Sequence, residues 1–189
     1  ISPTFTTDGS FNSISIGKGA NAVAGNTVLG ETALDAAVTG SNNVAIGKQA
    51  LTENTSGYNN ASVGAFSLIS NTTGAFNTAL GKDALGANTT ANNNTAVGAD
   101  ALTANTTGAQ NTAVGTSSLD ANTTGQFNVA LGQSALGGNS TGSNNTGLGR
   151  GAMEVNTTAS NNTAVGYASL AANTTGTQNV AVGALALDA

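Results

Sequence analysis

Apolar residues recur along this chain with a period of seventeen. Each repeat carries one Val, Ile or Leu among small residues and a second large apolar residue five positions later. The unit reads N-T-A-V-G-x-x-[AS]-L-x-x-N-T-T-G-x-x, numbered 1 to 17 from its first Asn. That Asn occurs ten times: Asn26, Asn43, Asn60, Asn77, Asn94, Asn111, Asn128, Asn145, Asn162 and Asn179. A constant period over ten copies predicts a solenoid in which each repeat forms one coil.

The N-T-A-V-G segment predicts a short strand, in which side chains at positions 2 and 4 share one face and those at positions 1, 3 and 5 the other. Position 4 is always Val, Ile or Leu, and position 9 is Leu in every repeat but one, where it is Met153. We therefore expect both columns to form the core. The position-4 column comprises Leu29, Ile46, Val63, Leu80, Val97, Val114, Leu131, Leu148, Val165 and Val182.

Gly at position 5 predicts an unusual backbone conformation or a close approach where the strand ends, and N-T-T-G has the composition of a turn that closes the coil. Two alternatives fit less well. A helix is disfavoured because Gly or Asn occurs every few residues. Disorder is disfavoured because a disordered chain need not keep apolar residues in register.

The first 25 residues depart from this period. The segment S-I-S-I-G-K-G-A at 13–20 matches N-T-V-L-G-E-T-A at 26–33 after a step of only thirteen residues, which predicts a shorter repeat over 13–25. Residues 1–12 are expected to form an irregular or extended lead-in, and 26–189 to form ten solenoid repeats, the last truncated. We expect the sequence to be a segment of a longer protein.

The amino-acid composition excludes most chemical functions. Only 7% of the residues are charged, and the chain has no His, Cys or Trp. The usual general bases, nucleophile–base pairs and most zinc sites are therefore missing, so we expect no enzyme activity, no metal and no cofactor. Four basic residues are too few for a nucleic-acid interface. No apolar run has the roughly 18 residues of a membrane helix, so this segment should not insert into a membrane.

Charged and aromatic residues occupy variable positions. From residue 26 onwards, every charge falls at position 6, 7, 10 or 11, which indicates that these positions face water. Five aromatic residues at variable positions are candidate surface contacts, although random decoration or local packing is the favoured explanation: Tyr58, Phe66, Phe76, Phe127 and Tyr167.

The turn segment also creates N-x-[ST] sequons at position 12. The same residues suit a turn stabilised by Asn and Thr ladders, so both interpretations stay open. The candidate glycosylation sites are Asn54, Asn71, Asn88, Asn105, Asn122, Asn139, Asn156 and Asn173.

One repeat holds too little apolar surface to fold alone, so coils must stack, and Asn at positions 1 and 12 could pair along the stack. The apolar content is thin even for a stack. Small residues at positions 3 and 8 would permit close approach of another chain, so we expect further burial between subunits.

Two segments resemble a known family. N-S-I-S-I-G-K-G-A at 12–20 and N-N-V-A-I-G-K-Q-A at 42–50 are similar to head repeats of trimeric autotransporter adhesins, and the longer unit resembles arrays in phage tail-fibre-like proteins. The resemblance covers 12–189. It implies three chains, each forming a left-handed parallel β-roll around a common axis.

Pattern and resemblance together predict an all-β fold. It is a parallel β-roll or β-solenoid with one 17-residue repeat per coil, assembled as an intertwined or side-by-side homotrimer. The expected function is a structural fibre segment, extracellular or on a cell or virion surface, acting as a rigid spacer and in adhesion to a host-surface glycan or protein. The alternative is a free-standing ice-binding solenoid. The adjacent Thr pair of the turn argues against it, because a flat Thr array needs Thr two residues apart.

Overall fold

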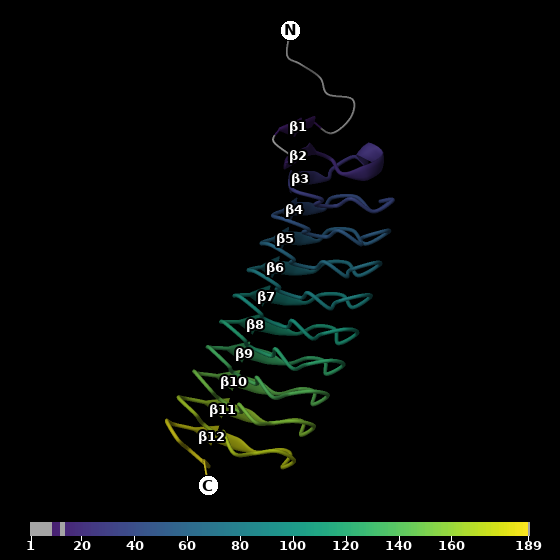
Figure 1. Cartoon of the computed structure of the whole chain (residues 1–189). Coiled ribbons are helices and arrows are strands. Elements are labelled where there is room, and N and C mark those ends of the chain that lie inside the picture. The colour runs from purple at the N-terminus through teal and green to yellow at the C-terminus, as the bar shows by residue number, and fades with distance from the viewer. Residues whose placement is uncertain (1–8, 12–13, 189) are drawn as a thin grey trace.

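In the computed structural model, which describes residues 9–11 and 14–188, the chain forms a β-solenoid whose coils stack from one end to the other (Figure 1). One sheet of twelve strands runs along the stack in sequence order. The elements are β1 (Gly9–Phe11), β2 (Ile14–Gly17), the 3-10 turn η1 (Ala20–Ala22), β3 (Thr27–Gly30), β4 (Val44–Ile46), β5 (Ala61–Val63), β6 (Thr78–Leu80), β7 (Thr95–Val97), β8 (Thr112–Val114), β9 (Val129–Leu131), β10 (Thr146–Leu148), β11 (Thr163–Val165) and β12 (Val180–Val182).

Strands β3 to β12 are parallel, and each pairs with the next at an offset of seventeen residues. Thr95 lies beside Thr112, and Val97 beside Val114. The turns follow the same register, since the Leu102 N–H donates to the Ser118 carbonyl of the next coil at 3.0 Å. Backbone bonding therefore joins whole coils rather than strands alone, which confirms the predicted parallel solenoid with one repeat per coil.

The segment before β3 differs from the prediction. Strand β2 pairs antiparallel with β3, and β1 pairs antiparallel with β2. Nine residues, 18–26, join β2 to β3, whereas fourteen, 47–60, join β4 to β5. An antiparallel return needs less chain than a parallel crossover, so the thirteen-residue step does not produce a coil of the same kind. Within the described residues, 14–25 does not form a parallel coil, and Gly9–Phe11 of the expected irregular or extended lead-in forms strand β1; residues 1–8 and 12–13 lie outside the described residues.

The interior of the coils consists of small residues at positions 3 and 8 and the large residue at position 9. In the central repeat these are Ala96, Ala101 and Leu102, all fully buried. The position-9 prediction is thus confirmed, and Met153 takes the same place with no exposed surface. In β10, Gly147 occupies position 3, and Leu136 Cγ lies 3.3 Å from where its Cβ would be. Position 3 therefore faces the Leu column.

The core prediction for position 4 is wrong. Position 3 points into the coil, so alternation turns position 4 outward. Across the coil the large residue at position 9 is opposed by Ala in most repeats, by Ser62 and Gly147 in two of them and by Val28 in the first. The small residues expected to admit another chain instead bring together the two walls of one coil. The side chains displaced from the predicted core are Leu29, Ile46, Val63, Leu80, Val97, Val114, Leu131, Leu148, Val165 and Val182.

Asparagine fills the rest of the interior. Asn111, at position 1, donates from Nδ2 to the Gly125 carbonyl at 2.9 Å, and its Oδ1 accepts from the Asn128 N–H at 3.0 Å. Asn105, at position 12, donates to Asn88 Oδ1 at 3.1 Å and to the Gly108 carbonyl at 2.9 Å. Within the described residues no buried side-chain nitrogen or oxygen lacks a partner. Both predicted Asn ladders therefore exist inside the coil.

Sharp turns in left-handed conformation give the coil its shape. Leu102 at position 9 has φ 52° and Asp100 at position 7 has φ 59°, which is unusual for residues with a side chain. Gly98, at position 5, has φ 135°, and a Cβ on it would lie 2.6 Å from the Gly115 carbonyl carbon and oxygen. Gly at position 5 therefore meets both predicted requirements, the unusual backbone and the close approach.

Candidate interaction surfaces

The outward side of the sheet carries the most extended apolar surface among the described residues. We call this surface, made of positions 2 and 4 of β3 to β12, the strand face. Position 4 contributes the ten apolar side chains excluded from the core, and Leu80 and Leu131 are 48% and 50% exposed. Position 2 contributes Thr27, Val44, Ala61, Thr78, Thr95, Thr112, Val129, Thr146, Thr163 and Val180.

The strand face has no charged side chain. Its ten strands, β3 to β12, lie side by side in parallel register. At about 4.8 Å between neighbouring strands they form a strip roughly 43 Å long. Apolar strips of this extent on a folded chain commonly mark an interaction surface. The coil interior is filled without these side chains, so the chain's own packing does not explain why position 4 is always large and apolar.

The five candidate aromatic contacts fall into different surroundings. Tyr58 and Phe76 form an edge-to-face pair with ring centroids 5.2 Å apart. The Arg150 guanidinium lies 5.0 Å from the centre of the Tyr167 ring and donates to its hydroxyl at 3.1 Å. Phe127 is exposed, whereas Phe66 is partly buried. Among the described residues the structure therefore brings together one aromatic pair, and engages Tyr167 with a cation.

Tyr58 and Phe76 border a shallow cavity of about 280 Å³. It is lined as well by Thr73, Ala75, Asn92 and Asn93, so it spans three successive coils. The sequence contained a signal for this pairing, because Tyr58 and Phe76 are one repeat plus one residue apart. Predicting the contact also required the backbone conformation at position 17, which the sequence does not show.

Charges lie beside the strand in the variable positions. Lys48 and Glu31, both exposed, form an ion pair at 3.3 Å across neighbouring coils, and Lys82 pairs with Asp83. Partial burial raises the pKa of the Asp120 carboxyl, and the charges of Asp100 and Glu154 raise it further against backbone hydrogen bonds that lower it. A raised folded-state pKa makes this group slightly destabilising once it ionises, so its effect disappears as pH falls.

Seven of the eight sequon Asn side chains do not face solvent. Seven of the predicted glycosylation sites, Asn54 to Asn156, are fully buried. Their side chains make the interior ladder, and Asn173 in the last coil makes the same contacts, with Asn156 Oδ1 at 3.3 Å and the Gly176 carbonyl at 2.9 Å. A glycan on any of the seven buried nitrogens would remove its hydrogen bonds and could not fit inside the coil. The glycosylation prediction is therefore wrong for these seven sites of the folded chain, whereas Asn173 is only partly buried.

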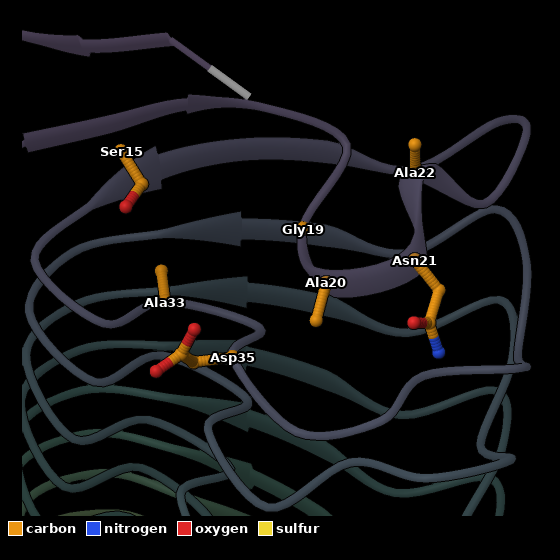
Figure 2. Close-up of a pocket in the computed structure, with 7 residues that line it drawn as sticks. All are labelled: Ser15, Gly19, Ala20, Asn21, Ala22, Ala33 and Asp35. Atoms are coloured by element: carbon orange, nitrogen blue, oxygen red, sulfur yellow. The ribbon is translucent and has the colours of Figure 1, made fainter. Parts of the chain in front are cut away.

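A second hollow lies between the N-terminal strands and the first coil (Figure 2). It measures about 340 Å³ and is lined mainly by backbone and small side chains, with the Ser15 hydroxyl and the Asp35 carboxylate as its polar groups besides Asn21. Within the described part of the chain there is no group of three His, Cys, Asp or Glu residues that could hold a metal ion. Nor does that part contain a helix long and apolar enough to span a membrane.

Comparison of the chain with protein-family models, curated proteins and solved structures found no match.

Proposed function

We propose that this chain is a non-enzymatic structural segment of a surface fibre, outside a cell or on a virion, in which three copies bury their strand faces against one another. The observation that carries the proposal is the uncharged strip of ten outward Val, Ile and Leu side chains. Each of them leaves water when the strip is covered, so association is favoured along the whole length of the stack.

A second copy of the same chain is the occupant that fits this strip best. The position-4 side chains recur at the same spacing in every copy. Two strand faces in register therefore place apolar side chains against apolar side chains along their whole length. The charges sit at positions 6, 7, 10 and 11 and would stay at the rim, where they do not oppose association. Three strips meeting at one axis would give a rod that serves as a spacer and presents each outer surface in triplicate.

Paired substitutions test this role. Val97→Asp with Val114→Asp places two carboxylates in the middle of the strand face, where the side chains are only partly buried within one chain. We expect the parent protein to have the mass of three chains by light scattering and the variant the mass of one, because a buried unpaired charge is costly. The circular dichroism spectrum should not change, since the interior is intact.

The matched control places the same two charges at position 6, two residues beyond position 4 and outside the strand face. Ala99→Asp with Thr116→Asp alters position 6, where other coils carry Lys82 and Arg150, and should leave three chains together. A monomeric parent protein would contradict the proposal. So would a trimeric Val97→Asp/Val114→Asp variant, since a face that tolerates two central charges is not buried.

One observation favours the ice-binding alternative. On the strand face Thr at position 2 lies two residues from the apolar residue at position 4, which is the spacing that the Thr pair of the turn lacks. Both side chains point outward from a regular parallel sheet. This arrangement can order water only while the face is open, so assembly and ice binding exclude each other. A folded monomer that inhibits ice recrystallisation would establish the alternative.

A further inference from the structure

We propose that the cavity beside Tyr58 and Phe76 binds one ring of a neutral saccharide. The inference deepens the adhesive part of the proposed function, but the cavity belongs to a single chain and does not depend on assembly. The carrying feature is an apolar corner of two exposed rings, next to a row of polar side chains and without a charge in its lining.

The two rings form the apolar part of the site. Their planes meet at 75°, and Tyr58 and Phe76 are 45% and 50% exposed. An edge-to-face pair leaves an open ring face beside a projecting edge. The apolar C–H face of a pyranose can stack on such a ring while its hydroxyls stay at the periphery. Neighbouring backbone holds the corner, since the Phe76 N–H donates to the Tyr58 carbonyl at 3.2 Å.

Polar groups complete the lining. Asn92 Oδ1 accepts from the Ala75 N–H at 2.7 Å, which fixes this amide at the cavity. Within the described residues, no hydrogen bond is made by the Tyr58 hydroxyl, the Thr73 hydroxyl or the side-chain amide of Asn93, whose backbone N–H donates to the Ala75 carbonyl at 3.1 Å. They offer donors and acceptors to sugar hydroxyls at small cost, because no internal bond must break. With no charged residue in the lining, the site favours a neutral sugar over an acidic one.

The size of the cavity limits the ligand. At about 280 Å³ it lies just below the roughly 300–1,000 Å³ of most small-molecule sites. It therefore suits one sugar ring, with the rest of a glycan extending into solvent. Such a contact is weak alone and gains strength when several copies bind one multivalent ligand.

The backbone at Phe76 suits Asn better than Phe. Phe76 has φ 59°, in the left-handed region that Asn tolerates better than a bulky residue. Other coils carry Asn at this position, including Asn59, Asn93 and Asn144, all with similar φ. A Phe here is strained and half-exposed, and its contact with Tyr58 returns only part of that cost. Phe127 occupies the same position in another coil with φ 58°, so what distinguishes Phe76 is its contact with the Tyr58 ring rather than its backbone conformation.

The test compares binding of soluble polymers bearing galactose, glucose or mannose with binding of a sialic-acid polymer. We expect the parent chain to bind at least one neutral polymer and to bind the acidic polymer more weakly. Phe76→Asn with Tyr58→Ser restores residues that other coils use at positions 17 and 16, so the coil should fold normally. Neutral-polymer binding should fall at least tenfold.

The matched control is Phe127→Asn, the same change at position 17 three coils away, which should retain binding. The proposal is overturned if no neutral polymer binds, if the acidic polymer binds better, or if the double variant binds like the parent. Light scattering on the same samples separates this proposal from the trimer. The Phe76→Asn/Tyr58→Ser variant should keep the mass of three chains. A monomeric parent protein that still binds the neutral polymer would contradict the trimer proposal and leave the saccharide proposal standing.

Discussion

Replacing Gly98 by Ala is expected to lower the free energy of unfolding by at least about 3 kcal/mol, because it adds backbone strain to an unavoidable clash. Gly98 has φ 135°, a conformation that side-chain-bearing residues rarely adopt, and the new methyl would lie 2.6 Å from the Gly115 backbone. The Cβ position is fixed by the backbone of residue 98, and its contact is the backbone of Gly115, so no side-chain rotation relieves the clash. Chemical denaturation followed by circular dichroism measures the loss.

The effect should extend beyond one coil. In a stack each repeat is stabilised by its neighbours, so a displaced central coil weakens two interfaces at once. Gly86→Ala is the control, because Gly86 is at position 10, where Thr103 stands one coil later, and the nearest atom to its new Cβ would be 3.2 Å away. We expect Gly86→Ala to change stability by less than about 1 kcal/mol. Equal effects of the two substitutions would mean that close coil contact at position 5 is not required.

The second large effect is expected for Asn111→Asp, which should cost about 3–5 kcal/mol at neutral pH. The substitution keeps the shape of the side chain but replaces the Nδ2 donor, which bonds the Gly125 carbonyl at 2.9 Å, with a carboxylate oxygen. Two oxygens then face each other without a proton between them, in a site with no exposed surface.

The loss should depend on pH. Burial raises the folded-state pKa of the introduced carboxyl above its unfolded value of about 3.9. The deficit relative to the parent should therefore be small near that pH and grow as pH rises through the folded-state pKa. Thermal melts at several pH values measure it. Asn93→Asp, at an exposed site, should show almost no deficit; a buried variant as stable as this control at pH 7 would refute the ladder's role.

The period of seventeen was sufficient to predict the parallel solenoid, the Gly column and the buried Leu column. It was not sufficient to assign position 4. Hydrophobicity ranks Val above Ala, so Val97 rather than Ala96 was placed inside. The direction of the strand decides instead: the position-3 side chain points inward toward the Leu column, and in every coil but the first, which has Val28, it is Ala, Ser or Gly. The small residues at positions 3 and 8 were the available signal, and they were assigned to contacts between chains.

The candidate sites show the same dependence on backbone path. Tyr58 and Phe76 were chosen as exposed variable residues, yet their pairing follows from the left-handed turn at position 17. The sequons were misassigned because turn composition was taken to mean exposure. In this coil the Asn of the turn points inward, where Asn105 and its equivalents satisfy the carbonyls that the turn leaves unpaired.

The interior ladder also makes the length of the molecule adjustable in equal steps. The Asn111 side chain bonds residues seventeen and fourteen positions away, in the coils on either side of its own, and the same bonds recur from coil to coil. Excising or duplicating one whole repeat therefore returns every inward group to a partner of the same kind. Such a change would alter the reach of the rod by about 4.8 Å and leave its cross-section alone. A gene encoding this chain could therefore lengthen or shorten its product by gaining or losing whole repeats.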